Sequence, residues 1–193
     1  MSSSKSNFWL SQLRELLLIT FSILLAFGLN AWYANHQERS QAEAYLAGIE
    51  EELAANQIEL TEKLEYHQQL LEILREDPAK ARMTLRPANI SNVAWKLSET
   101  AVFRKHIDPD LYKRIATAYQ THETLMNFVE TASDMMSEVN VIAPFYLLGA
   151  AQNMEDQELE AFYMMSRQGW VPMFETWTSL EQEYLEEIEG VLE

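Results

Sequence analysis

Residues 16–33 read LLLITFSILLAFGLNAWY, eighteen consecutive positions without a charged side chain. Arg14 and Glu15 precede this run, and Glu38 follows it closely. An α-helix rises about 1.5 Å per residue, so a helical run of this length crosses most of a hydrocarbon layer about 30 Å thick. The run therefore predicts a membrane-spanning helix over residues 16–34.

Two other interpretations of the run stay open. A cleaved secretory signal needs small residues at its cleavage site, and Ala-Phe-Gly at residues 26–28, with cleavage before Leu29, is the best candidate. A buried core helix is the other alternative, because eighteen residues lie at the lower edge of the spanning range. Trp9, Trp32 and Tyr33 bracket the run, and such rings settle at the headgroup level of a bilayer. These flanks favour the uncleaved anchor.

The basic residues near the run predict its orientation. Lys5 and Arg14 lie before it, together with the terminal amine, whereas Arg39 alone lies close after it. Because loops rich in Lys and Arg stay in the cytoplasm, the bias places residues 1–15 there and residues 35–193 outside. In a bacterium with two membranes, the anchor then lies in the inner membrane and the larger part of the chain lies in the periplasm.

The chain beyond the anchor is strongly acidic. The chain has 30 Asp and Glu against 14 Lys and Arg, a net charge of −16, and the acidic excess lies entirely after residue 39. An acidic surface repels nucleic-acid phosphates and anionic headgroups, so we expect no nucleic-acid partner and a domain that stands away from the bilayer. The absence of cysteine excludes disulfides, thiolate metal sites and thiol nucleophiles.

The sequence predicts an all-α fold, in which the membrane helix continues into a long helix of an antiparallel bundle. Glycine and proline are scarce, with five of each, and no segment alternates apolar and polar residues over a strand length. From about Glu38 to Arg75 or Glu76, apolar residues recur at three- and four-residue steps and form one stripe. The stripe comprises Leu46, Ile49, Leu53, Leu60, Leu64, Leu71 and Leu74.

This stripe has two possible partners. A two-stranded coiled coil is one, but Asn56, Lys63 and His67 interrupt the pattern that it needs. Packing against later helices of the same chain explains the stripe at least as well. The helix should end at Asp77, because the residue before a proline resists the α conformation.

Further helices are predicted after this end. Ser91-Asn92 is typical of an N-cap for a helix that runs through Val102. Asp108 is the expected cap, and Pro109 the first residue, of a helix that runs to about Ile142, after which Pro144 breaks or kinks it. Residues 157–168 and 172–192 predict the last helical pieces, which Gly169 separates. Short links between long helices favour antiparallel neighbours.

No residue pattern indicates catalysis. His106, Asp108 and Asp110 resemble a metal-binding cluster, but Asp108 before a proline is more simply a helix cap. A di-iron bundle needs Glu-x-x-His on two helices, and no histidine has a glutamate three residues before it. His67 and His122 are interpreted as solvated or core-edge residues. We therefore expect no catalytic residue, no metal, no cofactor and no enzymatic activity.

Two sets of residues have both a structural and a functional interpretation. A glutamate-rich series near the C-terminus predicts a solvated face, or otherwise a surface for a basic partner; it comprises Glu181, Glu183, Glu186, Glu187 and Glu189. An aromatic set predicts core packing, or otherwise the lining of an apolar pocket; it comprises Trp95, Phe103, Tyr112, Tyr119, Phe128, Trp170 and Trp177.

The membrane run carries a candidate interface. Ser22, Ala26 and Asn30 are four residues apart and so share one face of a helix. Small side chains let two helix backbones approach closely, and an amide in apolar surroundings seeks a hydrogen bond across the interface. The alternative is that Asn30 only reaches headgroups or water.

The residues around the run resemble a group of uncharacterised bacterial membrane proteins. These have one N-terminal span, a Leu-Asn-x-Trp exit (here residues 29–32) and a charged helix with Tyr-Leu (residues 45–46) and Glu-Leu-x-x-Asn (residues 52–56). The likeness is specific over residues 14–57, and it extends more loosely to residues 94–97 and 107–112. It implies a single-pass helical protein without an assigned activity.

Together these observations predict a function. We expect a membrane-anchored interaction or accessory subunit that binds another membrane protein or a second copy of itself. The alternative is a membrane-tethered sensor whose bundle binds a small apolar or cationic ligand.

Overall fold

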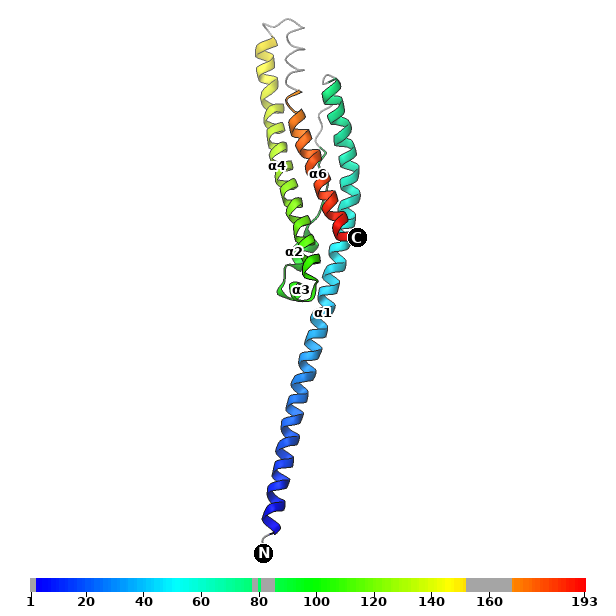
Figure 1. The fold of residues 1–193 in the computed structure, drawn as a ribbon. Helices are drawn as coiled ribbons and strands as arrows, with labels where there is room; N and C mark the ends of the chain where they lie inside the picture. The colour runs from blue at the N-terminus through cyan, green and yellow to red at the C-terminus, as the bar shows by residue number, and fades with distance from the viewer. Residues whose placement is uncertain (1–2, 78–79, 81–85, 152–167) are drawn as a thin grey trace.

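The structure, a computed structural model, is all-α, as the sequence predicts. It describes residues 3–77, 80, 86–151 and 168–193, and within these it contains five α-helices and no strand. Side chains are described for 12–77, 80, 86–137 and 168–193. One helix, α1 (Ser3–Glu76), extends along most of the molecule, and the other helices gather along its C-terminal half (Figure 1).

The length of α1 follows from its sequence. No proline occurs before Pro78, and nothing in the segment forces the backbone out of the helical conformation. The Asp77 amide still donates to the Ile73 carbonyl at 2.9 Å, and the helix ends at Glu76. The predicted end at Asp77 is confirmed, because the residue before a proline is sterically excluded from the α region.

Four other helices complete the described fold: α2 (Val93–Ser98), α3 (Ala101–His106), α4 (Pro109–Ala151) and α6 (Val171–Leu192). Helix α6 packs against both α1 and α4 and runs antiparallel to them, whereas α2 and α3 pack on α1 (Figure 1). The chain returns from the far end of α1 to the base of the bundle before α4 begins, so α1 and α4 run in the same direction.

The core lies between α1, α4 and α6. The predicted stripe of α1 faces it: Ile49, Leu53, Leu60, Leu71 and Leu74 are buried, and Leu46 is partly buried against them. The main contributions from the other helices are Phe103, Ile115, Ala118, Tyr119, Leu125, Phe174, Trp177, Tyr184 and Ile188. The stripe therefore packs against later helices of the same chain, and the aromatic set is mainly core.

The prediction of one continuous helix from Val93 through Val102 is wrong. The helix is interrupted between Ser98, where α2 ends, and Ala101, where α3 begins. Thr100 is extended there, with ψ near 155°, and its Oγ1 accepts a hydrogen bond from the Phe103 amide at 3.2 Å. This cap starts α3 in a new direction and lets Phe103 enter the core. Threonine supplies such caps readily, so it competes with helix continuation.

The predicted end of α4 is also wrong. The helix does not stop near Ile142 but continues past Pro144 to Ala151. A proline removes one backbone donor and crowds the preceding turn, yet it need not end a helix whose other residues favour the conformation. Most of the piece predicted at 157–168 lies outside the described residues, while the piece predicted at 172–192 corresponds to α6.

Candidate functional site

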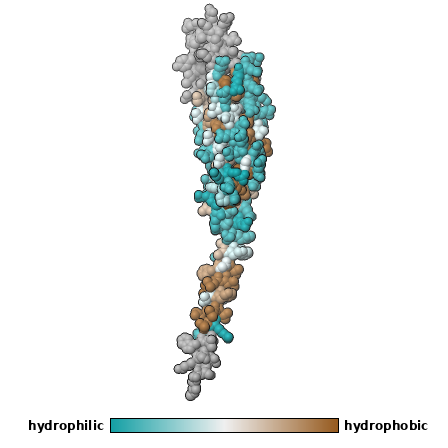
Figure 2. All heavy atoms as spheres, viewed as in Figure 1, coloured by the Kyte–Doolittle hydropathy of each residue, from teal (hydrophilic) through white to brown (hydrophobic). Residues whose placement is uncertain are grey.

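The N-terminal half of α1 is an apolar helix that the bundle leaves uncovered. Every described residue from 12 to 37 is exposed, and thirteen large apolar side chains between Leu13 and Tyr33 are 50–69% exposed. Figure 2 shows them as an apolar band below the hydrophilic bundle. This helix is long and apolar enough to cross a membrane, and none of its apolar window is buried. The interpretation as a buried core helix is therefore wrong.

Among the residues whose side chains the structure describes, the predicted site residues on this half have no neighbour from the bundle. Ser22, Ala26 and Asn30 are exposed on one face, and the Ser22 hydroxyl donates to its own helix, to the Leu18 carbonyl at 2.8 Å. Trp32 and Tyr33 are also exposed, and Trp32 stacks on His36 at 5.9 Å between ring centroids. Trp9 lies in α1, but its side chain is outside the described set.

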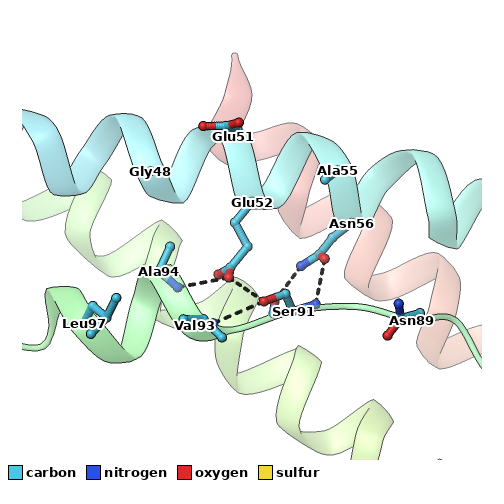
Figure 3. A pocket seen from close by; sticks show the side chains of 10 residues that line it. All are labelled: Gly48, Glu51, Glu52, Ala55, Asn56, Asn89, Ser91, Val93, Ala94 and Leu97. Carbon is cyan, nitrogen blue, oxygen red and sulfur yellow. Dashed lines mark hydrogen bonds between the residues drawn. The ribbon is translucent and has the colours of Figure 1, made fainter.

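The first polar cluster of the bundle centres on the carboxylate of Glu52. Its Oε2 accepts from the Ser91 hydroxyl at 2.7 Å and from the Ala94 amide at 2.9 Å (Figure 3). Its Oε1 accepts from the Tyr119 hydroxyl at 2.6 Å. Burial alone would raise the pKa of this carboxyl, but the hydrogen bonds from Tyr119, Ala94 and Ser91 outweigh burial and lower the pKa. Glu52 is thus held ionised.

Glu52 also explains how α2 begins. Asn92 was the expected cap, together with Ser91, but the Asn92 side chain makes no capping bond. The carboxylate of Glu52 instead receives the Ala94 amide in the first turn of α2. A negative charge at this end is favoured by the helix dipole and satisfies a donor that the helix leaves free. The cap therefore comes from α1, 42 residues away.

One turn further along α1, Asn56 fixes the segment that precedes α2. Its Nδ2 donates to the Ser91 carbonyl at 2.8 Å and to the Tyr184 hydroxyl at 3.1 Å. Its Oδ1 accepts from the Ser91 amide at 2.8 Å. A single buried amide therefore joins α1, the linking segment and α6. The sequence treats Asn56 as an interruption of a coiled-coil pattern, whereas the structure shows it as a junction of the bundle.

A groove runs along the solvent side of this cluster, between α1 and α2 (Figure 3). It measures about 450 Å³ and combines carboxylates with aliphatic and small side chains. Glu51 is exposed on its α1 side, and Val93 and Leu97, which are 60% and 64% exposed, lie on its α2 side. Because Glu52 already accepts three hydrogen bonds and is partly buried, Glu51 is the carboxylate that faces solvent.

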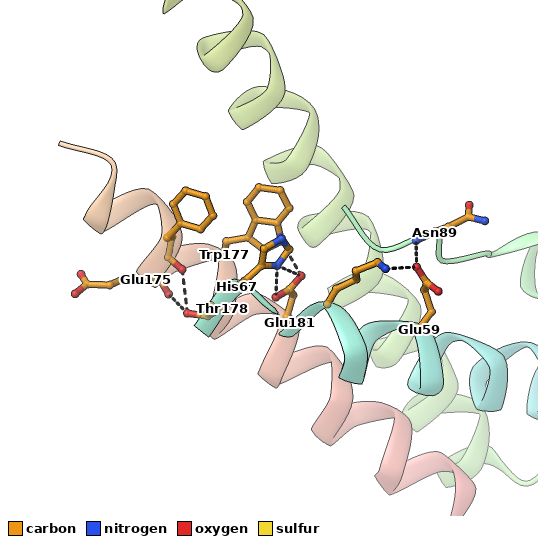
Figure 4. A network of polar contacts seen from close by, with 9 residues as sticks. Glu59, His67, Asn89, Glu175, Trp177, Thr178 and Glu181 are labelled. Atoms are coloured by element: carbon orange, nitrogen blue, oxygen red, sulfur yellow. Dashed lines mark hydrogen bonds and ion pairs between the residues drawn. The ribbon is translucent and has the colours of Figure 1, made fainter. Parts of the chain in front are cut away.

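The second polar cluster lies inside the core and corrects two predictions. His67 and Glu181 are both completely buried, although the sequence places His67 at the surface or core edge and Glu181 on a solvated face. His67 Nδ1 lies 2.9 and 3.0 Å from the two carboxylate oxygens, and Trp177 Nε1 donates to the same carboxylate at 2.8 Å (Figure 4). The ring of His67 lies 4.5 Å from that of Trp177.

The spacing of α6 contained a signal for this burial. Trp177, Glu181, Tyr184 and Ile188 follow one another at steps of four, three and four residues, which places the glutamate on the apolar face. Buried polar groups are normally paired, so a carboxylate in this phase requires a donor from another helix. His67 occupies the corresponding position in the stripe of α1. Glu183, Glu186 and Glu189 are exposed, as predicted.

His122 is a second histidine that the sequence placed wrongly, since its exposed fraction is only 4%. Neither ring nitrogen has a hydrogen-bond partner of normal geometry among the described atoms. Burial lowers the pKa of the ring, and the backbone of Ile90 partly offsets this effect. The ring lies 5.6 Å from that of Tyr184 and is neutral near pH 7.

The Asp108 cap is confirmed. Its Oδ1 accepts from the amides of Asp110 and Leu111, each at 3.0 Å, and α4 begins at Pro109. His106 instead pairs with Glu38 at 3.1 Å. Within the described residues, no three His, Asp or Glu side chains come together in a way that could hold a metal ion.

No protein-family model matches this chain, and no curated protein or solved structure matches it either. The resemblance to the single-pass bacterial group therefore stays a hypothesis. The residues that suggested it include Glu52 and Asn56, which the structure places at the junction of α1 with the segment before α2.

Proposed function

We propose that this protein is a single-pass membrane protein whose acidic helical bundle serves as an interaction or accessory subunit, without catalysis of its own. The observation that carries the proposal is the uncovered half of α1, with thirteen large apolar side chains exposed between Leu13 and Tyr33. Soluble monomers rarely expose an apolar patch of more than a few hundred Å². A bilayer would cover this one.

The proposed topology places residues 1–15 in the cytoplasm, residues 16–34 in the bacterial inner membrane and residues 35–193 in the periplasm. Lys5 and Arg14 before the run support this orientation. A periplasm-active reporter fused after Glu193 should be active, and one fused near Ser6 should be inactive. The opposite pattern would reverse the topology, and a mature N-terminus at Leu29 would identify the run as a cleaved signal.

The groove between α1 and α2 is the proposed contact surface of the bundle. Its exposed carboxylate, Glu51, and its aliphatic edge, Val93 and Leu97, suit a segment that presents basic and apolar side chains together. The net charge of −16 adds long-range attraction for such a segment. We therefore propose a basic, apolar segment of another membrane protein as the occupant.

Affinity purification in mild detergent, followed by mass spectrometry, tests this contact. The wild-type chain should retain a constant protein partner, and Leu97→Glu should lose most of it because a charge then occupies the apolar edge. Met135→Glu is the matched control, since Met135 is 54% exposed on α4, away from the groove. Equal retention by the two variants would show that the groove is not the contact surface.

The face of Ser22, Ala26 and Asn30 is a second proposed contact, within the bilayer. An interhelical hydrogen bond from the amide is worth about 1 kcal/mol, and small side chains permit close approach. Replacing Ser22 and Ala26 by Leu and Asn30 by Ala keeps the run apolar while blocking that approach. If this triple variant keeps the native association state in membranes, the run is only a tether.

The size of the groove favours one alternative function, that of a sensor. About 450 Å³ is within the range of small-molecule sites, and its lining suits a small apolar or cationic ligand. A ligand bound only by the folded state raises the unfolding temperature by mass action. Stabilisation by a pool of small cations, without a constant protein partner, would favour the sensor over the subunit.

A further inference from the structure

The base of the bundle differs in charge from the rest of it. From Lys96 to Arg114 the chain has five Lys and Arg against three Asp and Glu, although the chain as a whole has a net charge of −16. This segment contains α3 and both of its connections. Ala101, Arg104 and Lys105 are exposed and, at spacings of three and four residues, share one face of α3.

The contacts of α3 fix its distance from the apolar run. Lys105 Nζ lies 2.6 Å from Glu38 Oε2, and His106 Nε2 lies 3.1 Å from the same oxygen. Phe103 is fully buried and meets the ring of Tyr45 edge-on at 6.3 Å, so α3 is held against α1 by its core side as well. The Lys105 hydrogen bond lowers the pKa of Glu38, which keeps this carboxylate charged.

This geometry brings α3 to the level of the lipid headgroups. Glu38 is four residues beyond residue 34, where the proposed span ends, so it stands roughly 6 Å further along the helix axis. Each polar layer of a bilayer is about 5–7 Å thick outside the hydrocarbon core. If the apolar run spans the core, the base of the bundle, where α3 lies, meets the headgroup layer (Figure 1).

We propose that the exposed face of α3 binds anionic phospholipid headgroups in the leaflet from which α1 emerges. The inference rests on the proposed membrane anchor and adds a second, electrostatic contact to it. Arg104 supplies the principal charge, because it is exposed and has no ion pair within the described residues. Lys105 is paired with Glu38, so its charge is largely offset and Arg104 is the main cation of this face.

The contact gives the acidic bundle a defined orientation relative to the bilayer. An anionic surface repels the acidic part of the bundle away from α3 and attracts the base of the bundle. The bundle should therefore stand upright, with α3 against the bilayer. The composition predicts only that the domain keeps away from the bilayer. The position of α3 adds that one end of the domain approaches it.

The absence of cysteine permits a direct test with the full-length protein. A fluorophore on Ala101→Cys reports the base, and one on Gln68→Cys, about 45 Å further along α1 from Glu38, reports the far end. Both proteins are reconstituted into vesicles that contain a headgroup-linked quencher. The vesicles are either phosphatidylcholine alone or phosphatidylcholine with phosphatidylglycerol.

Quenching should be strong at residue 101 and weak at residue 68, greater with phosphatidylglycerol, and reduced when the salt is raised from 50 to 500 mM. The quenching at residue 101 gives the equilibrium constant between bundles with α3 against the bilayer and bundles with α3 away from it. Arg104→Gln should lower this constant roughly fivefold, as expected for a surface cation worth about 1 kcal/mol. Arg86→Gln, an exposed cation beside Tyr66 and far from α3, should leave it unchanged.

The outcomes separate this proposal from the anchor. Equal quenching in the two lipid mixtures, or no effect of Arg104→Gln, would overturn headgroup binding while vesicle flotation still confirmed the anchor. Equal quenching at the two labels would overturn the upright stance and the α3 contact with it. Protein that is removed from vesicles by alkaline carbonate would overturn the anchor and, with it, the contact that depends on it.

Discussion

The two halves of α1 have the same backbone conformation but opposite surroundings. Between Leu13 and Tyr33, large apolar side chains cover the helix on all sides, and every one of them is exposed. Between Ala42 and Leu74, apolar side chains form one stripe, and that stripe is buried. A helix that is apolar all round needs an apolar environment on every side, whereas a striped helix needs only a neighbour along one face.

The halves differ equally in their polar residues. The packed half buries Asn56 and His67, and each has partners on α6. The uncovered half places Ser22 and Asn30 on its outer surface, where the Ser22 hydroxyl donates only to its own helix, at the Leu18 carbonyl, and a partner for the Asn30 amide must come from another molecule or from water. Polar residues in the packed half therefore specify how this chain folds, and those in the uncovered half are available for association.

The largest effect is expected from charges in the uncovered half. Leu24→Arg combined with Leu25→Arg should release the protein from the membrane fraction, because each arginine costs about 2.5–3.5 kcal/mol at the centre of a span. The measurement is resistance to alkaline carbonate extraction. Ile58→Arg is the control in the packed half, where Ile58 is 75% exposed, and it should alter neither retention nor stability by more than about 0.5 kcal/mol. A double variant that still resists extraction would refute the lipid-embedded position.

The next effect is expected in the packed half, at the buried pair. Glu181→Ala should lower the free energy of unfolding by about 3–5 kcal/mol, since it leaves His67 and Trp177 buried without their shared acceptor. Glu183→Ala, an exposed neighbour on α6, should change it by less than about 0.5 kcal/mol. Thermal unfolding in detergent measures both.

A double variant sharpens this test. His67→Leu with Glu181→Leu removes both members of the buried pair and leaves an apolar contact, so it should recover much of the stability that Glu181→Ala loses. Recovery will be incomplete, because Trp177 Nε1 stays without an acceptor. Equal stability of the Glu181→Ala and Glu183→Ala variants would contradict the buried position of Glu181.

The packed half should also respond to acid. Because burial lowers the pKa of His122, the unfolded chain binds this proton more readily than the folded chain. The contribution is therefore complete above the ordinary pKa of 6.5 and is lost as pH falls below it, by at most about 1.4 kcal/mol per pH unit. The lowered pKa of Glu52 adds a further loss only below its ordinary value of 4.5.

Urea unfolding between pH 7.5 and 5 measures this dependence. His122→Phe should flatten the decline in stability below pH 6.5, because the ring can no longer take up a proton. His36→Gln, at an exposed site on the uncovered half, should keep the wild-type dependence. A decline of equal steepness in the His122→Phe variant would assign it to other groups.

The sequence predicted the long-range order of the helices from simple periodicity. Apolar spacing identified α1 and the buried face of α6, and proline and Asp108 marked the end of α1 and the start of α4. It failed at the local break between α2 and α3, because the Thr100 cap competes with helix continuation by a small free-energy difference that only tertiary packing decides.

The polar clusters were harder to predict for a related reason. Glu52, Asn56 and Ser91 come together only when a linking segment returns along α1, and no local pattern encodes that return. His67 and Glu181 are separated by 114 residues, and each has polar or charged neighbours in sequence that suggest a solvated surface. Their burial could be inferred only from helical phase, which the composition of the segment obscures.

A smaller effect is expected at the start of α4. Asp108→Ala should lower the free energy of unfolding by about 1 kcal/mol, because the amides of Asp110 and Leu111 lose their acceptor. Asp108→Asn keeps an acceptor and should cost much less. Asp110→Ala removes only a favourable charge in the first turn and should cost a few tenths of a kcal/mol. Equal losses for the alanine and asparagine variants at 108 would contradict the capping role.

The smallest effect compares the two glycines of α1 directly. A Cβ at Gly48 would meet Ala94 Cβ at 3.9 Å, an ordinary van der Waals contact, and a Cβ at Gly28 would meet nothing within 4 Å. Alanine therefore fits at both positions, yet only Gly48 belongs to the half whose folding depends on packing. Gly48→Ala should raise the free energy of unfolding of the bundle by about 0.5–1 kcal/mol through reduced freedom of the unfolded chain. Gly28→Ala should leave it unchanged, because a helix within a bilayer stays helical when the bundle unfolds. Both substitutions are measured by urea unfolding in the same detergent. Equal stabilisation by the two would mean that the halves of α1 unfold together, so that the boundary near Glu38 does not separate two independently unfolding parts of the helix.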